Sequence, residues 1–212
     1  VSIFANLIRN IDKIDKLIYF GSGAEYSKYR NLVKVKETEI GKNIPTDDYG
    51  LSKFLCNEVS KNNKKILNLR IFGVFGENEN YLQAFISNAI VKNLFNQSIK
   101  INQNVKFDYL YSSDLISVIK YFLKHKTKYN DYNLTPTKSI TLKEIAEIIN
   151  QISEKSSEIK ILHKGLNFSY TGNNKRLTNE IKNLKFTEYK EGIRKVYEYR
   201  KRSIEKLDKK AI

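Results

Sequence analysis

Apolar positions in the first third of the chain follow two alternating patterns. Between residues 2 and 14 they recur every three or four positions, which predicts an amphipathic helix. Residues 16–20 and 66–74 are almost continuous apolar runs, the pattern of strands buried on both faces of a parallel sheet. Residues 46–48 carry a threonine and two aspartates, which favour the start of a helix that we expect to end near residue 60.

The rest of the chain continues this alternation, with weaker signals towards its end. Helices are predicted at 81–95, from residue 113, at 141–152 and at 190–207, and strands at 99–101, 107–111, 132–134 and 159–162. Thr141 with Glu144 has the spacing of a capping box. Strands that alternate with helices favour an α/β fold around a parallel sheet, and the fading pattern beyond residue 155 predicts a smaller, irregular lobe. Residues 27–45 are polar and irregular, and loops of this length tend to be functional.

Composition fits a soluble globular protein. Of the 212 residues, 41% are hydrophobic and 12% aromatic, too many for a disordered chain and too evenly spread for a membrane span. No secretory leader pattern is present near Val1, so we expect a cytoplasmic protein with no membrane partner. The single Cys56 cannot form an internal disulfide, and no cysteine and histidine stand at metal-ligand spacing, so we expect no metal site.

The net charge of +15 raises the question of nucleic-acid binding, because clustered Lys and Arg side chains bind phosphates. Most of the charge is lysine scattered through polar segments rather than gathered into one stripe. We therefore expect solvated lysines and no nucleic-acid partner, although part of the charge would steer an anionic small molecule such as a nucleotide sugar. A basic nucleic-acid-binding domain is the alternative, and it would need a single basic stripe.

Tyr49 and Lys53 are the most informative polar pair in the sequence. Residues four apart on a helix project from one face, so both side chains can reach one ligand. An ammonium about 4 Å from the phenol oxygen, at an effective dielectric of about 20, favours the phenolate by roughly 4 kcal/mol. This would suit the tyrosine to general acid–base catalysis. The spacing alone is common, and the alternative is a surface tyrosine beside a solvated lysine.

Ser22 strengthens the catalytic interpretation. It follows a predicted buried strand in a Gly-Ser-Gly turn, and open α/β sheets bind ligands at the carboxyl ends of their strands. A serine there can hydrogen-bond the oxygen on which Tyr49 acts. The alternative is a serine favoured only by turn geometry.

Five motifs follow one another along the chain. They are Leu17-Ile18-Tyr19-Phe20-Gly21-Ser22, Tyr49-Gly50-Leu51-Ser52-Lys53, Leu69 to Gly76 (LRIFGVFG), Phe107 to Leu115 (FDYLYSSDL) and Tyr132-Asn133-Leu134. The ordered series resembles extended short-chain dehydrogenases/reductases, and more closely their NAD-dependent epimerase/dehydratase branch, which acts on nucleotide sugars. The resemblance implies an incomplete Rossmann-like doubly wound parallel sheet with a smaller carboxy-terminal substrate-binding lobe. Residues 1–79 would be the carboxy-terminal half of the dinucleotide-binding domain and 80–212 mainly the substrate lobe, with 106–135 packing back on the sheet.

The resemblance also implies catalytic roles. Tyr49 would exchange a proton with a sugar hydroxyl or ketone, and Ser22 would orient the reacting oxygen and so contact the substrate. Tyr49 and Lys53 would both contact the cofactor, NAD or NADP, with Lys53 holding the nicotinamide ribose. Phe72 falls where relatives contact the nicotinamide.

Three further positions are expected to face the nucleotide-sugar substrate. Gly73 stands where many relatives carry a substrate-contacting asparagine, which leaves the sugar open. Lys106 takes a place often held by an arginine near the substrate nucleotide, and Arg176 lies where a basic residue can approach the diphosphate. The alternative for Lys106 and Arg176 is a solvated side chain.

The residues after Ser22 separate the reactions of the family. The 4,6-dehydratases place an acidic pair there, whereas this chain has Gly23 and Ala24, and Glu25 stands one place too late. Dehydration is therefore disfavoured. The simplest chemistry left is hydride transfer at one sugar carbon, either 4-epimerisation or reduction of a 4-keto group. A role in surface polysaccharide synthesis and a possible homodimer follow from family analogy alone.

No G-x-G-x-x-G or G-x-x-G-x-x-G motif occurs in the sequence, although the family begins with such a turn. The chain also begins at Val1 and contains no methionine. We therefore expect a fragment that lacks roughly 90 residues and binds a dinucleotide poorly or not at all. The alternative function is a catalytically inactive truncated remnant or a binding module.

Overall fold

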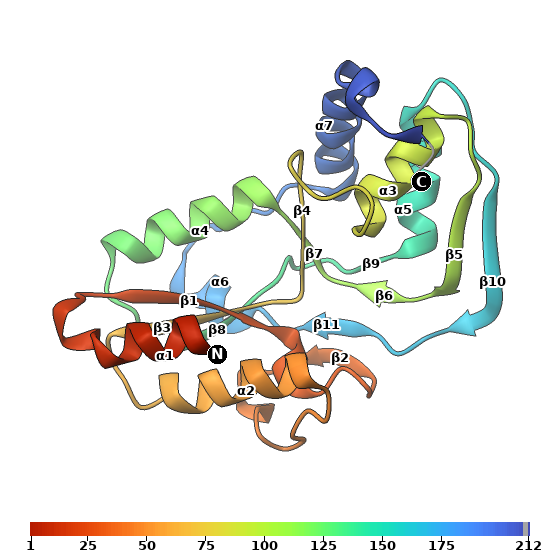
Figure 1. Ribbon diagram of the computed structural model, residues 1–212. Helices are drawn as coiled ribbons and strands as arrows, with labels where there is room; N and C mark the ends of the chain where they lie inside the picture. Colours follow the sequence, from red (N-terminus) through yellow and green to blue (C-terminus); the bar gives the residue numbers. More distant parts are fainter. Residues whose placement is uncertain (210–211) are drawn as a thin grey trace.

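A three-stranded parallel sheet in the order β1-β3-β8 forms the centre of one half of the molecule (Figure 1). The computed structural model describes residues 1–209 and 212. The sheet consists of β1 (Leu17–Ser22), β3 (Ile66–Ile71) and β8 (Asp131–Leu134). Its register places Ser22, Ile71 and Leu134 level with one another at the carboxyl end. The predicted α/β class and parallel sheet are therefore confirmed.

Helices lie on both faces of this sheet. On one face are α1 (Ser2–Arg9) and α2 (Asp48–Ser60), and on the other is α4 (Ser112–Lys124) (Figure 1). Successive side chains of a strand point to opposite faces. Leu67 and Leu69 of β3 thus pack with Val118 and Phe122 of α4. Arg70, which follows Leu69 in β3, is also fully buried, on the face that α2 covers.

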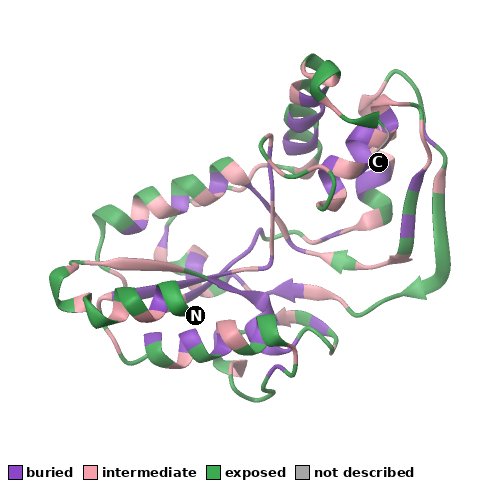
Figure 2. Ribbon diagram, viewed as in Figure 1, coloured by how far each residue is buried: buried purple, intermediate pink, exposed green. Residues whose placement is uncertain are grey.

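Three helices and a pair of strands form a second core. The helices are α3 (Phe85–Leu94), α5 (Leu142–Ile152) and α7 (Tyr189–Arg202), and the parallel strands are β5 (Ile99–Asn104) and β10 (Ile159–Leu166). Ile86, Ile90, Ile145, Ile149, Ile193 and Val196 are buried between the helices. β10 is exposed along most of its length (Figure 2).

Short strands connect the two halves. β2 (Leu32–Val35), β11 (Tyr170–Gly172), β6 (Lys106–Phe107) and β9 (Ile140–Thr141) form a sheet in the order β2-β11-β6-β9. β4 (Gly73–Phe75) pairs with β7 (Tyr109–Tyr111). A further helix, α6 (Lys175–Glu180), and the 3-10 turns η1 (Ile11–Lys13), η2 (Gly23–Tyr26), η3 (Glu37–Glu39) and η4 (Ile204–Lys206) complete the elements. The pairing of β8 with β3 is observed, whereas the domain boundary near residue 79 stays a prediction.

The structure corrects two expectations about irregular segments. The polar loop 27–45 contains β2, and the lobe beyond residue 155, which was expected to be irregular, contains β11 and α6. Both strands are held by neighbours far away in the sequence, because Tyr170 of β11 pairs with Leu32 of β2 and with Phe107 of β6. The Thr141–Glu144 capping box is confirmed.

The described residues contain neither a membrane-spanning helix nor a cluster of metal ligands. None of their helices is long and apolar enough to cross a membrane. Nor do three or more His, Cys, Asp or Glu side chains gather in this part of the chain as a metal ion would require. Cys56 is buried and unpaired.

Candidate active site

Ser22 ends β1 and begins the tight turn η2. Its hydroxyl oxygen accepts a hydrogen bond from the Ala24 N–H at 3.1 Å, and its own N–H donates to Glu25 Oε1 at 3.0 Å. This reciprocal pattern is a capping box, which satisfies backbone donors at the start of a helical turn. Ser22 is therefore held at the carboxyl end of the sheet by its own turn, where it is 6% exposed.

The start of α2 lies against this turn. Asp47 caps the helix by accepting the Gly50 N–H at 3.0 Å, and Lys28 pairs with the same carboxylate at 3.1 Å. Burial acts to raise the pKa of Asp47, but the Gly50 N–H and the Lys28 ammonium outweigh it and hold that pKa below its ordinary value. A Cβ on Gly50 would lie 3.0 Å from the Ala24 carbonyl oxygen. This close approach brings the neighbouring Tyr49 to the Ser22 turn, with its side chain 54% exposed.

Lys53 connects α2 to β1. Its Nζ donates to the Phe20 carbonyl oxygen at 2.8 Å and lies 5.8 Å from the centroid of the Tyr49 ring. The structure thus brings Ser22, Tyr49 and Lys53 together around the end of one strand. The stabilisation of a Tyr49 phenolate by Lys53 stays a prediction, since the ammonium is bonded to the backbone.

Tyr170 belongs to the same group of side chains, and sequence reasoning missed it. Its hydroxyl oxygen is 3.5 Å from Ser22 Oγ. Burial raises the pKa of the Tyr170 phenol, the hydrogen bond with Ser22 acts to lower it, and the neighbouring Tyr49 acts to raise it. Proximity to both Ser22 and Tyr49 places Tyr170 inside the candidate site.

A hollow of about 410 Å³ opens beside Tyr170. It is lined by Lys28, Tyr29, Val105, Phe107, Asn167, Phe168 and Tyr170. Its size is in the range of small-molecule sites, and its lining combines aromatic rings with a cation. The hollow is therefore a candidate entrance for a substrate that reaches Ser22.

Phe72 packs against the Ser22 turn, and Gly73 follows it at the start of β4. Phe72 is 8% exposed and its ring packs 5.1 Å from that of Tyr170, so it is brought to the site as part of a small core. Its contact with a nicotinamide stays a prediction. A Cβ on Gly73 would lie 2.9 Å from a ring carbon of Tyr109. The Tyr109 ring therefore occupies the space into which an asparagine at position 73 would project.

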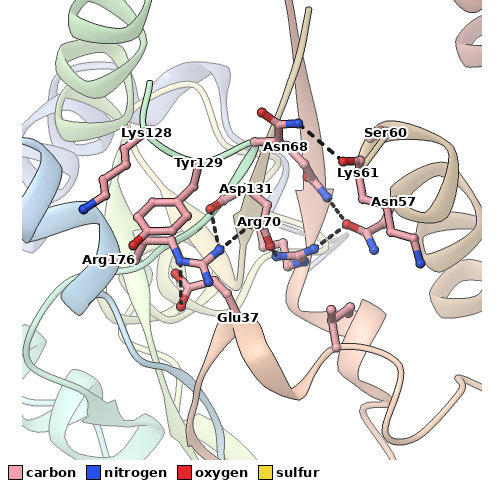
Figure 3. Close-up of a pocket in the computed structure, with 12 residues that line it drawn as sticks. Glu37, Asn57, Ser60, Lys61, Asn68, Arg70, Lys128, Tyr129, Asp131 and Arg176 are labelled. Atoms are coloured by element: carbon pink, nitrogen blue, oxygen red, sulfur yellow. Dashed lines mark hydrogen bonds and ion pairs between the residues drawn. The ribbon is translucent and has the colours of Figure 1, made fainter. Parts of the chain in front are cut away.

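Arg176 is not brought to this group. It pairs with Asp131, lies 3.9 Å from a Glu37 carboxylate oxygen and stacks 4.4 Å from the centroid of the Tyr129 ring (Figure 3). Asp131 is level with Tyr19 in the sheet register and two strands away from it, so its Cα lies about 14 Å from that of Ser22. Its two carboxylate partners hold the guanidinium, and the expected approach of Arg176 to a diphosphate stays a prediction.

Lys106 is also separate from Ser22. It is exposed on β6, where its neighbour Phe107 packs 5.4 Å from Tyr170. Because side chains alternate along a strand, Lys106 points to the other side of the sheet. There its charge adds to the Thr141 hydrogen bonds in lowering the pKa of the Glu144 carboxyl. Its contact with a substrate nucleotide stays a prediction.

Buried and partly buried charges form a chain of ion pairs behind the site, and sequence reasoning missed them. Arg70 pairs with Glu25 and with Asp131, and Asp131 pairs in turn with Arg176 (Figure 3 shows the last three). Glu25 also holds the Ser22 backbone. Through Glu25, these ion pairs help to stabilise the turn that carries Ser22.

A model of the NAD dependent epimerase/dehydratase family matches residues 2–135. The ADP-L-glycero-D-manno-heptose-6-epimerase of Brachyspira hyodysenteriae is 26% identical over 163 residues, which are 69% of this chain and 49% of that protein. The chain therefore spans about half the length of this curated relative.

Solved structures share the fold. The UDP-glucuronic acid 4-epimerase of Bacillus cereus, in complex with UDP-glucuronic acid and NAD, superposes with a TM-score of 0.77 at 20% identity over 89% of this chain and 62% of that one. RMD from Pseudomonas aeruginosa, complexed with NADPH, gives 0.79 at 18% identity over 94% and 71%. At these identities the likeness shows a common fold.

Proposed function

The chain belongs to the NAD-dependent epimerase/dehydratase family, and we propose that the whole protein is an NAD(P)-dependent epimerase or 4-ketoreductase of a nucleotide-linked sugar. The main support for this proposal is that Ser22, Tyr49 and Lys53 lie close together at the carboxyl end of β1. Such an edge is where open α/β sheets bind their ligands. Because the chain spans only part of its relatives, the activity proposed is that of the whole protein.

Each of the three residues has a proposed task. The exposed Tyr49 phenol exchanges a proton with the sugar oxygen, and Ser22 hydrogen-bonds that oxygen and fixes its position. A bound nicotinamide would supply the hydride acceptor and donor at the sugar carbon. Lys53, already directed at the end of β1 by the Phe20 carbonyl, holds the ribose next to Tyr49.

The residues present fit one end of the cofactor. Tyr49 and Lys53 lie beside β1, which pairs only with β3 among the described residues, and Phe20, two residues before Ser22, is 43% exposed. This leaves an accessible surface for the nicotinamide ribose. The sequence has no glycine-rich phosphate-binding turn, so no residue is assigned to the pyrophosphate, and the choice between NAD and NADP is left open.

The type of reaction follows from the residues after Ser22. Gly23 and Ala24 cannot supply the acid and base that elimination of water requires, so a reaction confined to one sugar carbon is favoured. Two of the similar proteins are epimerases of nucleotide-linked sugars by name. A place in surface polysaccharide synthesis is proposed on the family alone.

The test is turnover of nucleotide sugars with NAD or NADP, followed by absorbance at the nicotinamide band and by NMR of the sugar. The Tyr49→Phe variant should lose about 100-fold or more of the rate, because general acid–base catalysis contributes this much. Its affinity for the nucleotide sugar should stay within about twofold of wild type, since the removed hydroxyl acts mainly in the transition state.

Two outcomes would contradict the proposal. Equal turnover in wild type and Tyr49→Phe would remove the acid–base role. Nucleotide-sugar binding by calorimetry without any turnover would favour the binding-module alternative. Tyr199→Phe is a matched control, because Tyr199 lies on α7 and its hydroxyl contacts Asn78.

A further inference from the structure

We infer that Tyr170 is a positioning residue that donates a hydrogen bond to Ser22 Oγ and thereby turns the Ser22 hydroxyl proton towards the substrate oxygen. The inference rests on the proposed function for its catalytic consequence. Its structural part, the direction of one hydrogen bond, can be tested without turnover.

Two strands and two aromatic rings fix the position of Tyr170. Its backbone pairs with Leu32 on one side and with Phe107 on the other, in the sheet that joins the two halves of the molecule. Its ring lies 5.1 Å from the Phe72 ring and 5.4 Å from the Phe107 ring. A side chain held by two strands and two rings presents its hydroxyl at a defined point.

The turn at Gly23 is shaped around this hydroxyl. A Cβ at position 23 would lie 2.8 Å from the Tyr170 oxygen and 2.6 Å from a ring carbon of Phe72. Only glycine therefore leaves the phenol room to reach Ser22. Gly23 and Tyr170 thus fit against each other beside Ser22, although Tyr170 lies 148 positions after Ser22 in the chain.

The hydrogen bonds of Ser22 Oγ leave one acceptor site for Tyr170. A serine hydroxyl has two acceptor sites and one proton. The Ala24 N–H fills one acceptor site at 3.1 Å, and the Tyr170 oxygen lies 3.5 Å away. Ser22 Oγ has no third polar partner among the described residues.

Ser22 Oγ is the one hydrogen-bond partner of the Tyr170 hydroxyl among the described residues. A buried phenol proton needs an acceptor, so in this proposal Tyr170 is the donor in the pair. With both acceptor sites filled, the only role left to Ser22 is to donate, and the available acceptor is the substrate oxygen. The 3.5 Å separation is long for such a bond, as is common before a substrate draws on the hydroxyl.

The kinetic test is a double-mutant cycle with Tyr170→Phe and Ser22→Ala. Tyr170→Phe should lower kcat about tenfold, the equivalent of one hydrogen bond, with KM changed less than twofold. In the Ser22→Ala background the same change should have no further effect, because there is no hydroxyl to orient. Equal losses in both backgrounds would show a structural role only and overturn the inference.

The second test observes the hydrogen bond itself. In the whole chain labelled with tyrosine at Cζ, the Tyr170 hydroxyl proton should be detectable by NMR, and Ser22→Ala should shift its resonance. Tyr199→Phe should leave that resonance in place. An unchanged Tyr170 resonance in Ser22→Ala would overturn the inference. A wild-type protein without turnover would contradict the proposed function, and the NMR result alone would then decide whether Tyr170 orients Ser22.

Discussion

The guanidinium of Arg70 and the carboxylate of Glu25 form an ion pair directly behind the Ser22 turn, where their side chains are 1% and 0% exposed. Glu25 also accepts the Ser22 N–H at 3.0 Å. A buried pair of this kind is costly to break, because removal of one partner leaves the other charge without compensation. The turn that carries Ser22 therefore depends on a charge in the neighbouring strand β3.

Replacement of Arg70 tests this dependence. Arg70→Met should lower the free energy of unfolding by about 3 to 5 kcal/mol, because Glu25 would remain buried and unpaired. Urea unfolding followed by circular dichroism measures the change. The double variant Glu25→Gln/Arg70→Met is the control and should recover part of the loss. A loss below about 1 kcal/mol in the single variant would show that the pair does not stabilise the fold.

The cap of α2 is the second point to test. Asp47→Ala should lower the free energy of unfolding by about 1 kcal/mol, because the Gly50 N–H loses its acceptor at the start of the helix. Asp47→Asn keeps a capping oxygen and should cost less. Thermal unfolding compares the two variants. If both cost the same, the ion pair with Lys28 rather than the cap carries the effect.

Asp47 should also give stability a dependence on pH in acid. A carboxyl whose pKa is lower in the folded than in the unfolded chain adds stability above its unfolded pKa of about 3.9, and this is lost as pH falls through the folded-state pKa. Asp47 is such a group, since the Gly50 N–H and Lys28 outweigh burial. The stability difference between wild type and Asp47→Asn should therefore shrink as pH falls from about 6 to about 2.5. A difference independent of pH would contradict the assignment.

Gly23 offers a test of packing at the turn. Gly23→Ala would place a methyl group 2.6 Å from a Phe72 ring carbon, and overpacking of this kind costs about 1 to 3 kcal/mol of stability. Urea unfolding measures it. The double variant Gly23→Ala/Phe72→Leu should recover part of the loss, because the smaller side chain makes room. A stable Gly23→Ala single variant would mean that the turn can shift away from Tyr170.

Replacement of Arg176 tests whether its side chain contacts the substrate or only forms ion pairs within the protein. Arg176→Ala should leave the affinity for a nucleotide sugar within about twofold, because its partners Asp131 and Glu37 lie away from Ser22. Calorimetric titration measures the affinity. A loss of about tenfold or more would restore the role that its sequence position suggested.

Local signals in the sequence predicted the local structure well. The helix that begins after Asp47 and the Thr141–Glu144 capping box both depend on residues within one turn of each other, and both are observed. The strand that ends at Ser22 also follows from its neighbours, because an apolar run ends there in a turn. These elements bring together three of the predicted site residues.

Long-range relationships were not accessible in the same way. β2 and β11 have four and three residues, too few for a periodic pattern, and each is stabilised by a partner strand far along the chain. Arg70 lies within a mostly apolar run, and nothing local shows that Glu25 neutralises it. The contact between Tyr170 and Ser22 depends on the long-range pairing of β11 and on the turn that Glu25 supports. Neither can be read from neighbouring residues, which explains why the contact was missed.

The separation of Ser22 and Tyr170 by 148 positions also bears on how the protein folds. Bringing together residues so far apart in the chain costs loop-closure entropy, whereas the contacts within a single helix are local. Such long-range contacts therefore form late in folding. The Asp47 cap and α2 can form from neighbouring residues, whereas the hydroxyl pair requires β2, β11 and β6 to have assembled. A nascent chain released from the ribosome before residue 170 would thus carry Tyr49 and Lys53 but could not yet orient Ser22. The site is therefore completed only late in folding, after the sheet that contains β11 has formed.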